Sequence, residues 1–215
     1  MPEPLRVILA DDHEIVRSGL RMVLEAAGNI EIVAEAGTAD DAVRYVLGHK
    51  PDVLVLDLNM PGTPSLETLP QVNEASPDTA VVVLTMQSGT AFAREALRAG
   101  VRGYVLKESA GAELVQALRT AADGGTYLTP SLGARLATEP EVPELPDGIT
   151  SREAEVLSLL ALGHTNAEIG DRLHLSRRTV ESHRASLQSK TGCATRAELV
   201  RYALDHQLLE AAEQD

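Results

Sequence analysis

Six polar residues in the first half of the chain lie at, or shortly after, the ends of short apolar runs. One run, "DVLVL", leads straight into an acid and then into "LNMPG", which has the composition of a turn. Another run, "RVILA", leads into two adjacent acids. Two further runs end at a threonine and just before a lysine. The six residues are Asp11, Asp12, Asp57, Asn59, Thr85 and Lys107.

This set of side chains predicts phosphoryl chemistry if the fold brings it together. Three neighbouring acids repel one another, so such a cluster is normally stabilised by a cation. Oxygen ligands without cysteine or clustered histidine favour a hard ion, which indicates Mg²⁺ rather than Zn²⁺. A carboxylate can act as a nucleophile and form an aspartyl-phosphate. A lysine and a hydroxyl beside the ion suit a phosphoryl group, because its transfer depends on positioning and charge neutralisation.

The pattern of apolar residues predicts an α/β domain that can position this set. Apolar stripes with helical spacing separate the runs, and five strands that are each followed by a helix indicate a parallel sheet with helices on both faces. The functional surface of such a sheet lies at the carboxyl ends of its strands, where the six residues would meet. The expected strands are 5–10, 30–36, 52–57, 79–85 and 102–106.

These residues resemble the motif set of the receiver domain of bacterial two-component response regulators, over about residues 4–123. The resemblance implies a five-stranded sheet with the flavodoxin-like order 2-1-3-4-5. It also implies that Asp57 is the phospho-acceptor. Mg²⁺ would be held by Asp11, Asp12, Asp57 and the backbone carbonyl of Asn59. The phosphoryl group would contact Thr85 and Lys107, with Tyr104 as an aromatic switch residue.

A change of composition after Gly124 predicts a linker over residues 125–146. The segment holds four prolines, and four acids lie between residues 139 and 147. A short helix near 131–137 is compatible with the pattern, and the remainder indicates an acidic, semi-extended linker. Docking between the domains could order it instead. The expected domains are a receiver at 1–124 and a helical domain at 147–215.

Capping signals in the last third of the chain predict four short helices. Three Ser/Thr-x-x-Glu capping boxes begin at Thr150, Thr165 and Thr195, and Ser176 can cap a fourth helix. A link of three residues, 174–176, joins two of these helices, which is a helix-turn-helix arrangement. The expected helices are 151–162, 166–173, 177–190 and 196–206.

The helical segment resembles the LuxR-type helix-turn-helix domain of the NarL/FixJ subfamily, over about residues 147–206. The chain carries a net charge of −13, but residues 172–190 hold five basic residues against one acid. The resemblance makes 177–190 the recognition helix in a DNA major groove, with Arg184 and Lys190 at phosphates. The predicted DNA-contact residues are Arg177, Arg178, Thr179, Glu181, Ser182, Arg184, Ala185 and Lys190.

The resulting hypothesis is a DNA-binding transcription regulator that is controlled by phosphotransfer from a sensor histidine kinase. Its partners would be that kinase, the half-sites of promoter DNA and a second copy of the chain. The lone Cys193 forbids an internal disulfide, and neither a signal peptide nor a membrane-spanning stretch is evident, so we expect a cytoplasmic protein without a membrane partner. An alternative is a phosphorylation-independent regulator that binds DNA or protein. A phosphatase of the haloacid dehalogenase type would need an acid where Asn59 stands, so we do not expect an enzyme.

Overall fold

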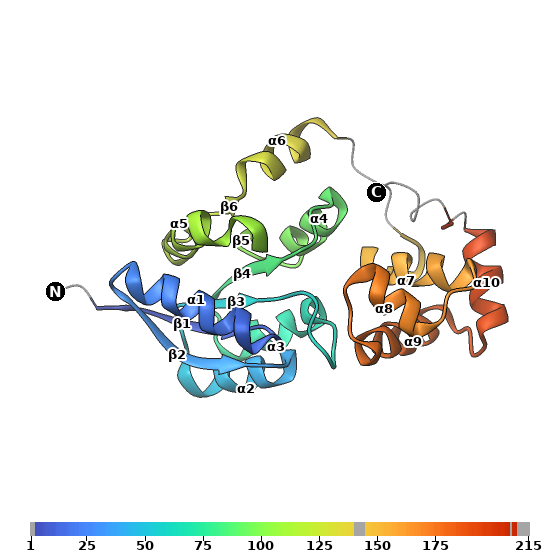
Figure 1. Cartoon of the computed structure of the whole chain (residues 1–215), viewed down its shortest axis with the longest axis horizontal. Coiled ribbons are helices and arrows are strands. Elements are labelled where there is room, and N and C mark those ends of the chain that lie inside the picture. Colours follow the sequence, from blue (N-terminus) through green and yellow to red (C-terminus); the bar gives the residue numbers. More distant parts are fainter. Residues whose placement is uncertain (1–2, 140–144, 207, 210–215) are drawn as a thin grey trace. The chain divides into compact units, whose positions relative to one another are not determined.

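The computed structural model describes residues 3–139, 145–206 and 208–209. The chain divides into two units, Met1–Pro140 and Glu141–Asp215 (Figure 1). Each unit has its own hydrophobic core. We therefore describe each unit by itself.

The first unit is built on a parallel sheet whose strands have the order β2-β1-β3-β4-β5-β6. The predicted order is confirmed for the first five strands, and a sixth is added. β3 is buried along its whole length because strands inside a parallel sheet have both faces covered. The strands are β1 (Leu5–Ala10), β2 (Ile30–Ala36), β3 (Val53–Leu56), β4 (Ala80–Thr85), β5 (Gly103–Leu106) and β6 (Tyr127–Leu128).

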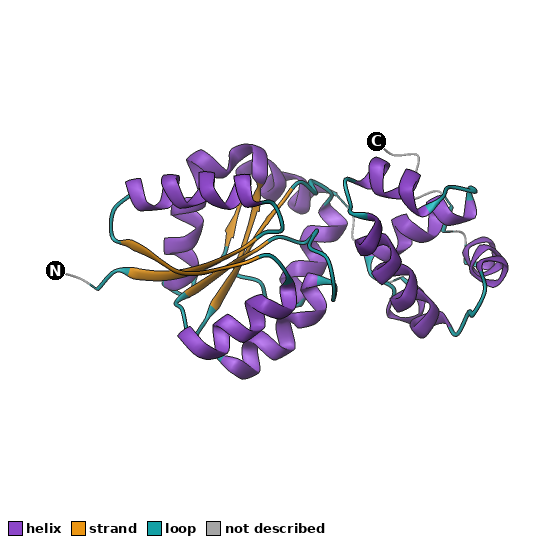
Figure 2. Ribbon diagram, turned by 60° about the horizontal axis from the view of Figure 1, so that its bottom comes forward, coloured by secondary structure: helices purple, strands orange, loops and turns teal. Residues whose placement is uncertain are grey.

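Helices cover both faces of this sheet (Figure 2). Successive side chains of a strand point to opposite faces, so Val7 and Leu9 pack on one side while Ile8 packs on the other. The first face is covered by α1 (Glu14–Ala26) and α5 (Ala110–Ala122). The second is covered by α2 (Ala39–His49), α3 (Leu69–Ala75) and α4 (Thr90–Arg98), with short 3₁₀ turns at Ser65–Thr68 and Lys107–Ser109 elsewhere in the unit.

The sequence predicts a linker over 125–146 that can hold a short helix near 131–137. That helix is present, and residues 125–138 are built into the first unit. The amide of Tyr127 donates to the carbonyl of Arg102, which attaches β6 to β5. The next helix, α6 (Pro130–Thr138), buries Leu132 in the core of the second face. Proline is tolerated in the first turn of a helix, so Pro130 begins α6 rather than preventing it. The acidic stretch at 140–144, which was expected to be semi-extended, lies outside the described residues.

The second unit is a helical bundle in which the predicted helices and caps are confirmed. The three capping boxes form, and the hydroxyl of Ser176 accepts the backbone N–H of Thr179. A left-handed residue, His174, ends α8 and begins the short turn into α9. The helices are α7 (Ser151–Ala161), α8 (Asn166–Leu173), α9 (Arg177–Thr191) and α10 (Arg196–Asp205), after a 3₁₀ turn at Pro146–Gly148. None of the helices in the described ranges is long and apolar enough to cross a bilayer.

Candidate functional site

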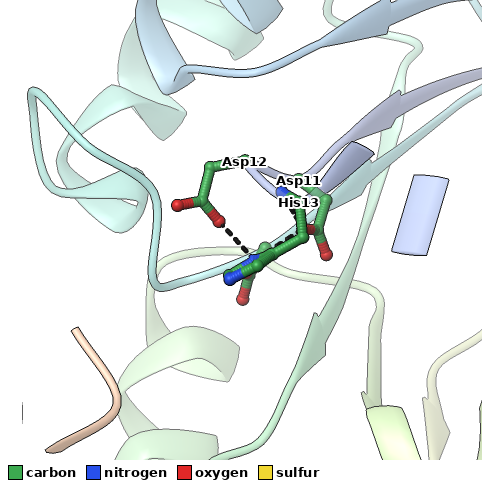
Figure 3. Close-up of side chains that lie close together, drawn as sticks. Asp11, Asp12 and His13 are labelled. Atoms are coloured by element: carbon green, nitrogen blue, oxygen red, sulfur yellow. Dashed lines mark hydrogen bonds and ion pairs between the residues drawn. The ribbon is translucent and has the colours of Figure 1, made fainter. Parts of the chain in front are cut away.

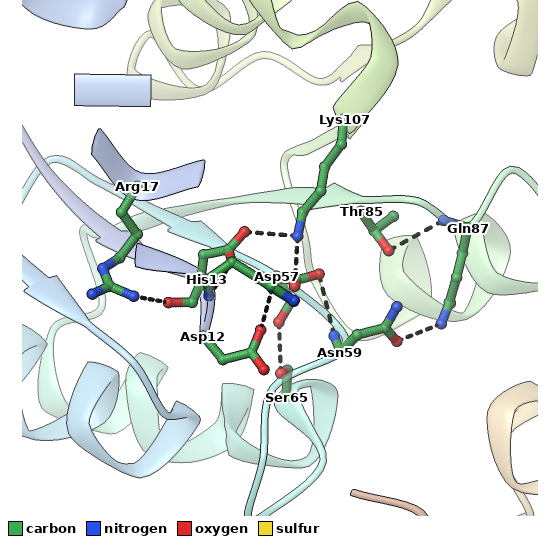
Figure 4. Close-up of polar contacts among 10 residues, drawn as sticks. Asp12, His13, Arg17, Asp57, Asn59, Ser65, Thr85, Gln87 and Lys107 are labelled. Carbon is green, nitrogen blue, oxygen red and sulfur yellow. Dashed lines mark hydrogen bonds and ion pairs between the residues drawn. The ribbon is translucent and has the colours of Figure 1, made fainter. Parts of the chain in front are cut away.

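An acidic pocket lies at the carboxyl end of the sheet, where β1 and β3 end side by side (Figure 4). The amide of Asp57 donates to the carbonyl of Ala10, so the backbone after β3 is held against the end of β1. The side chains of Asp57 and Asp11 are almost fully buried, with 1% and 3% exposed. Two carboxylates are therefore held close together with little access to bulk water.

Lys107 connects these two carboxylates from the end of β5. Its Nζ lies 2.8 Å from Asp57 Oδ2 and 2.7 Å from Asp11 Oδ2. Burial raises the pKa of Asp57, and the charge of Lys107 opposes that rise. Burial also lowers the pKa of Lys107, but the two carboxylates outweigh burial and leave the pKa above its usual value. The lysine is therefore held as a cation beside Asp57.

Asp12 and His13 form the open side of the pocket (Figure 3). The imidazole Nδ1 of His13 lies 2.7 Å from Asp12 Oδ1 and 3.3 Å from Asp11 Oδ1, while the backbone N–H of His13 donates to Asp11 Oδ1. From the sequence, in which His13 directly follows the acid pair, we expect a polar neighbour of the site rather than a metal ligand. The side chain of His13 contacts both acids and is 63% exposed, so it lies at the rim of the pocket.

The oxygen donors of the pocket fit a hard divalent cation. Asp11, Asp12, His13 and Asp57 can each offer one ligand atom, and these four atoms lie within 4.8 Å of one another. Carboxylates are the side chains that Mg²⁺ and similar ions prefer. Asn59 lies next to these carboxylates, and its backbone N–H donates a hydrogen bond to Asp57 Oδ1 at 3.2 Å.

Gln87 ties the predicted switch residues to the pocket, and the sequence analysis did not identify it. Its side chain donates to Asn59 Oδ1 at 2.9 Å, and its backbone N–H donates to the hydroxyl of Thr85 at 3.3 Å. The buried hydroxyl of Tyr104 donates to the carbonyl of Gln87 at 2.9 Å. Thr85 and Tyr104 are therefore both hydrogen-bonded to Gln87. The sequence does not show this link, because it depends on how the chain folds.

The side chain of Ser65 holds the backbone of Asp57, which follows β3. Its buried hydroxyl donates to the backbone carbonyl of Asp57 at 2.7 Å. The hydroxyl of Thr68 in turn donates to the carbonyl of Ser65. These bonds hold the turn after Asp57 against the end of β3.

Met86, next to Thr85, has 55% of its surface exposed, so its side chain lies toward solvent rather than in the core.

The second unit presents a helix with one buried and one exposed side. In α9, Val180, His183 and Leu187 are buried in the bundle. Arg178 and Ala185 are exposed on the opposite side. A helix with exposed arginines and small residues on its outer face, attached to another helix by a short turn, is the arrangement that reads a DNA major groove.

Two family models match the chain and together cover most of it. Residues 7–119 match the response regulator receiver domain, and residues 147–203 match the bacterial regulatory proteins of the luxR family. The chain belongs to the LuxR-type two-component response regulators. It is a DNA-binding response regulator, with the NarL/FixJ arrangement of a receiver followed by a helix-turn-helix domain.

Several similar proteins match this chain over nearly its whole length. The oxygen regulatory protein NreC of Staphylococcus epidermidis is 36% identical and covers 96% of this chain and 100% of its own length. NreC of Staphylococcus carnosus is 35% identical with the same coverage. Among solved structures, the RcsB response regulator of Salmonella typhimurium is 28% identical, with a TM-score of 0.60 over 93% of this chain and 99% of its own. An RcsB–DNA complex gives a TM-score of 0.59, at 28% identity over 94% of this chain and 98% of that one.

Within this response regulator, three predicted DNA-contact residues have other partners in the fold. Thr179 is 2% exposed and shares a hydrogen bond with the hydroxyl of Ser176, so it is not on the outer face of α9. Arg184 donates to the side chain of Asn166 at 2.8 Å. Lys190 is paired with Glu153, whose side chain has no exposed area. The contacts of Arg184 and Lys190 join different helices, so sequence spacing did not reveal them.

The remaining predicted residues lie on the accessible side of the recognition helix. Arg177, Arg178, Glu181 and Ala185 are exposed, and Ser182 is half-buried. Arg177 Nε lies 3.2 Å from Glu181 Oε1, one turn along α9. An exposed ion pair of this kind contributes little to stability, so both side chains can exchange it for contacts with another molecule.

Proposed function

We propose that Asp57 accepts a phosphoryl group from the phosphohistidine of a sensor kinase, and that this modification controls DNA binding by α9. The observation that carries the proposal is the position of Asp57. It directly follows the central strand β3, is buried beside Asp11, and is paired with the cationic Lys107 at 2.8 Å. A buried carboxylate with a fixed cation beside it is arranged to receive an anionic group.

In the transfer step, one carboxylate oxygen of Asp57 attacks the phosphorus. The new P–O bond forms as the P–N bond to the kinase histidine breaks, and the leaving imidazole nitrogen keeps the electron pair of that bond. Asp57 must be ionised to react, and Lys107 favours this form by opposing the effect of burial on the pKa. After transfer, the same ammonium group can pair with a phosphoryl oxygen.

We further propose that the pocket binds Mg²⁺ through the carboxylates of Asp11, Asp12 and Asp57 and the backbone carbonyl of Asn59. The spacing of the three carboxylates supports this set. A bound Mg²⁺ would neutralise charge on the phosphoryl oxygens. Asp11 and Lys107 already share an ion pair, so they keep the side chains of the pocket in place.

Thr85 and Tyr104 are proposed to report the modification. The Thr85 hydroxyl accepts a hydrogen bond from the backbone N–H of Gln87, and it can turn to donate a hydrogen bond to a phosphoryl oxygen. Tyr104 would follow, because its hydroxyl is bound to the carbonyl of Gln87. A change of charge at Asp57 can bias such a two-state arrangement.

The output would be the binding of a homodimer to promoter half-sites in the cytoplasm. Arg178 and its exposed neighbours on α9 would enter the major groove, and two copies would read half-sites spaced by about 10 bp. The RcsB structures with DNA support this proposal, since one of them holds RcsB dimers and the chain resembles RcsB over most of its length.

The test is intact mass of the full chain after incubation with Mg²⁺ and acetyl phosphate, followed by DNA binding with and without the donor. We expect one added phosphate, lost in Asp57→Ala and in chelator, and retained in the matched control Asp78→Ala, whose exposed acid lies outside the pocket. DNA affinity that is the same in Asp57→Ala and in the phosphorylated protein would instead favour a phosphorylation-independent regulator. Sustained release of inorganic phosphate would indicate a phosphatase.

A further inference from the structure

The helix after the sheet, α6, is joined to α4 by contacts that cap the ends of both helices. The guanidinium of Arg94, on α4, donates to the carbonyls of Leu136 and Glu139, each at 2.8 Å. In return, a carboxylate oxygen of Glu139 accepts from the hydroxyl of Thr90, the first residue of α4, at 2.5 Å. Each helix therefore supplies the polar group that the other helix end needs.

These reciprocal contacts are electrostatically favourable at both ends. Gly89 precedes α4 and has no side chain to cap it, so the carboxylate of Glu139 lies near an N-terminus that favours negative charge. Arg94 places positive charge at the C-terminus of α6. Hydrogen bonds from Thr90 and then Arg135 hold the pKa of Glu139 below its usual value. The carboxylate is thus charged at neutral pH.

A third contact extends from α6 to the loop between β4 and α4. Arg135 Nη1 donates to the carbonyl of Ser88 at 3.0 Å, and Arg135 Nε lies 2.8 Å from Glu139. The only buried apolar side chain of α6 in the described part of this helix is Leu132. Leu136 is partly buried and packs against the same core. The polar contacts of Arg94, Arg135 and Glu139, which we call the α6 strap contacts, add to this apolar packing in holding α6.

The loop held by the strap contacts is also the loop that touches the phosphorylation pocket. Gln87 is bonded to Thr85, Asn59 and Tyr104, and the next residue, Ser88, accepts from Arg135. One peptide unit therefore separates the hydrogen bonds of the pocket from those of α6. A movement of Gln87 is transmitted directly to the carbonyl that Arg135 holds.

We propose that α6 is a strap that is docked on α4 when Asp57 is free and is released when Asp57 is phosphorylated. The inference rests on the proposed function of Asp57. When Thr85 turns toward the phosphoryl group, Gln87 loses the acceptor of its backbone N–H, and the 87–89 backbone shifts. The bonds of Ser88 and Thr90 to α6 are then lost. Because the chain continues from α6 into the second unit, release changes the segment that tethers the DNA-binding domain.

The experiment is hydrogen exchange by mass spectrometry on the full chain, with and without Mg²⁺ and acetyl phosphate. We expect the α6 amides of Gly133–Thr138 to exchange about tenfold faster after phosphorylation, because helix release exposes them to opening. Asp57→Ala should show no response to the donor. Glu139→Gln should exchange faster before any donor is added, since it loses the charge that accepts from Thr90 and Arg135. Glu74→Gln, an exposed acid on α3, is the matched control.

Intact mass of the same samples separates the two proposals. Added phosphate with unchanged or slower exchange in α6 would overturn the strap while leaving Asp57 as the acceptor. No added phosphate in a folded protein would overturn both. If Glu139→Gln exchanges like the wild type, the strap contacts do not hold α6. Arg135→Gln, which loses the hydrogen bond to the carbonyl of Ser88, is a second variant that tests whether the strap contacts hold α6.

Discussion

The ammonium group of Lys190 lies 2.8 Å from a carboxylate oxygen of Glu153, and that carboxylate is fully buried. The same oxygen accepts the backbone N–H of Thr150, which caps the start of α7. One ion pair therefore joins the last turn of the recognition helix to the first turn of α7. Lys190 therefore has a structural partner inside the bundle, and its predicted contact with a DNA phosphate stays a prediction.

Replacing Lys190 with methionine should destabilise the helical unit by about 3 kcal/mol, because it leaves a buried carboxylate without its cation. Burial raises the pKa of Glu153, but the hydrogen bond from Lys190 and two others outweigh burial, so the pKa lies below its usual value. Urea unfolding followed by far-UV circular dichroism measures the loss. The control is Arg178→Met, an exposed basic residue of the same helix. Equal stability of the two variants would contradict the structural role.

Replacing Arg178 with alanine should weaken DNA binding by about tenfold, or roughly 1.4 kcal/mol, without changing the stability of the fold. Its side chain is exposed on α9 and is free to reach a phosphate or a base edge. Fluorescence anisotropy with a labelled promoter fragment measures the affinity. Arg44→Ala removes the same charge from an exposed site on α2 and should bind DNA normally. A comparable loss in that control would show that net charge alone explains the effect.

Replacing Lys107 with methionine should strengthen Mg²⁺ binding several-fold, because a cation is removed from beside Asp11 and Asp57. The same variant should respond poorly to phosphorylation, since no ammonium remains to pair with the phosphoryl group. Calorimetric titration with Mg²⁺ gives the affinity, and Lys107→Arg keeps the charge. Weaker Mg²⁺ binding in the methionine variant would mean that the lysine organises the carboxylates more than it competes with the ion.

The helical unit should lose stability as the pH falls from about 6.5 to about 4. Burial, and then the charge of Arg152, lower the pKa of His183 from 6.5 to about 4. Below pH 6.5 the unfolded chain binds a proton that the folded one does not, so protonation favours unfolding. We expect a cost of about 2 kcal/mol between pH 7 and pH 5. The charged groups around this imidazole are Arg152, Glu153 and Lys190.

Urea unfolding at both pH values, compared with His183→Leu, isolates this contribution from that of the acids elsewhere in the chain. The leucine variant keeps an apolar side chain in the core but cannot titrate. Its stability should depend less on pH over this range. Parallel losses in both proteins would assign the pH dependence to other groups.

The acidic pocket was predictable because its residues lie at the ends of strands. A parallel sheet brings the ends of β1, β3 and β5 to one edge, so Asp11, Asp57 and Lys107 had to meet once the strands were recognised. The capping boxes were equally local, since Thr165 and Glu168 lie within one turn. Such features depend on short stretches of sequence, and short stretches carry strong signals.

The features that sequence did not reveal depend on contacts between distant segments. Gln87 is an ordinary polar residue until Tyr104 and Asn59 fold against it. The short helix that the sequence allows near 131–137 is present as α6, and Leu132 and Leu136 pack against the core. Its polar contacts with Arg94 and Ser88 join distant segments, so the pattern could not show them. The helical spacing of residues 177–190 places Val180 and Leu187 on the side opposite Arg178 and Ala185, and both are buried. It could not show that Lys190 reaches back to Glu153 on another helix.

The pairing of β6 with β5 determines where the receiver can be cut for study in isolation. The receiver family match ends at residue 119, before β6 and α6. A fragment that ended there would leave β5 as an edge strand whose backbone groups lack the partners that β6 provides. It would also expose to water the apolar side chains that Leu132 covers. Bare edges can pair with strands of other molecules, so we expect such a fragment to associate more readily than one that keeps β6. A fragment that ends after Glu139 keeps both coverings and is the better isolated receiver.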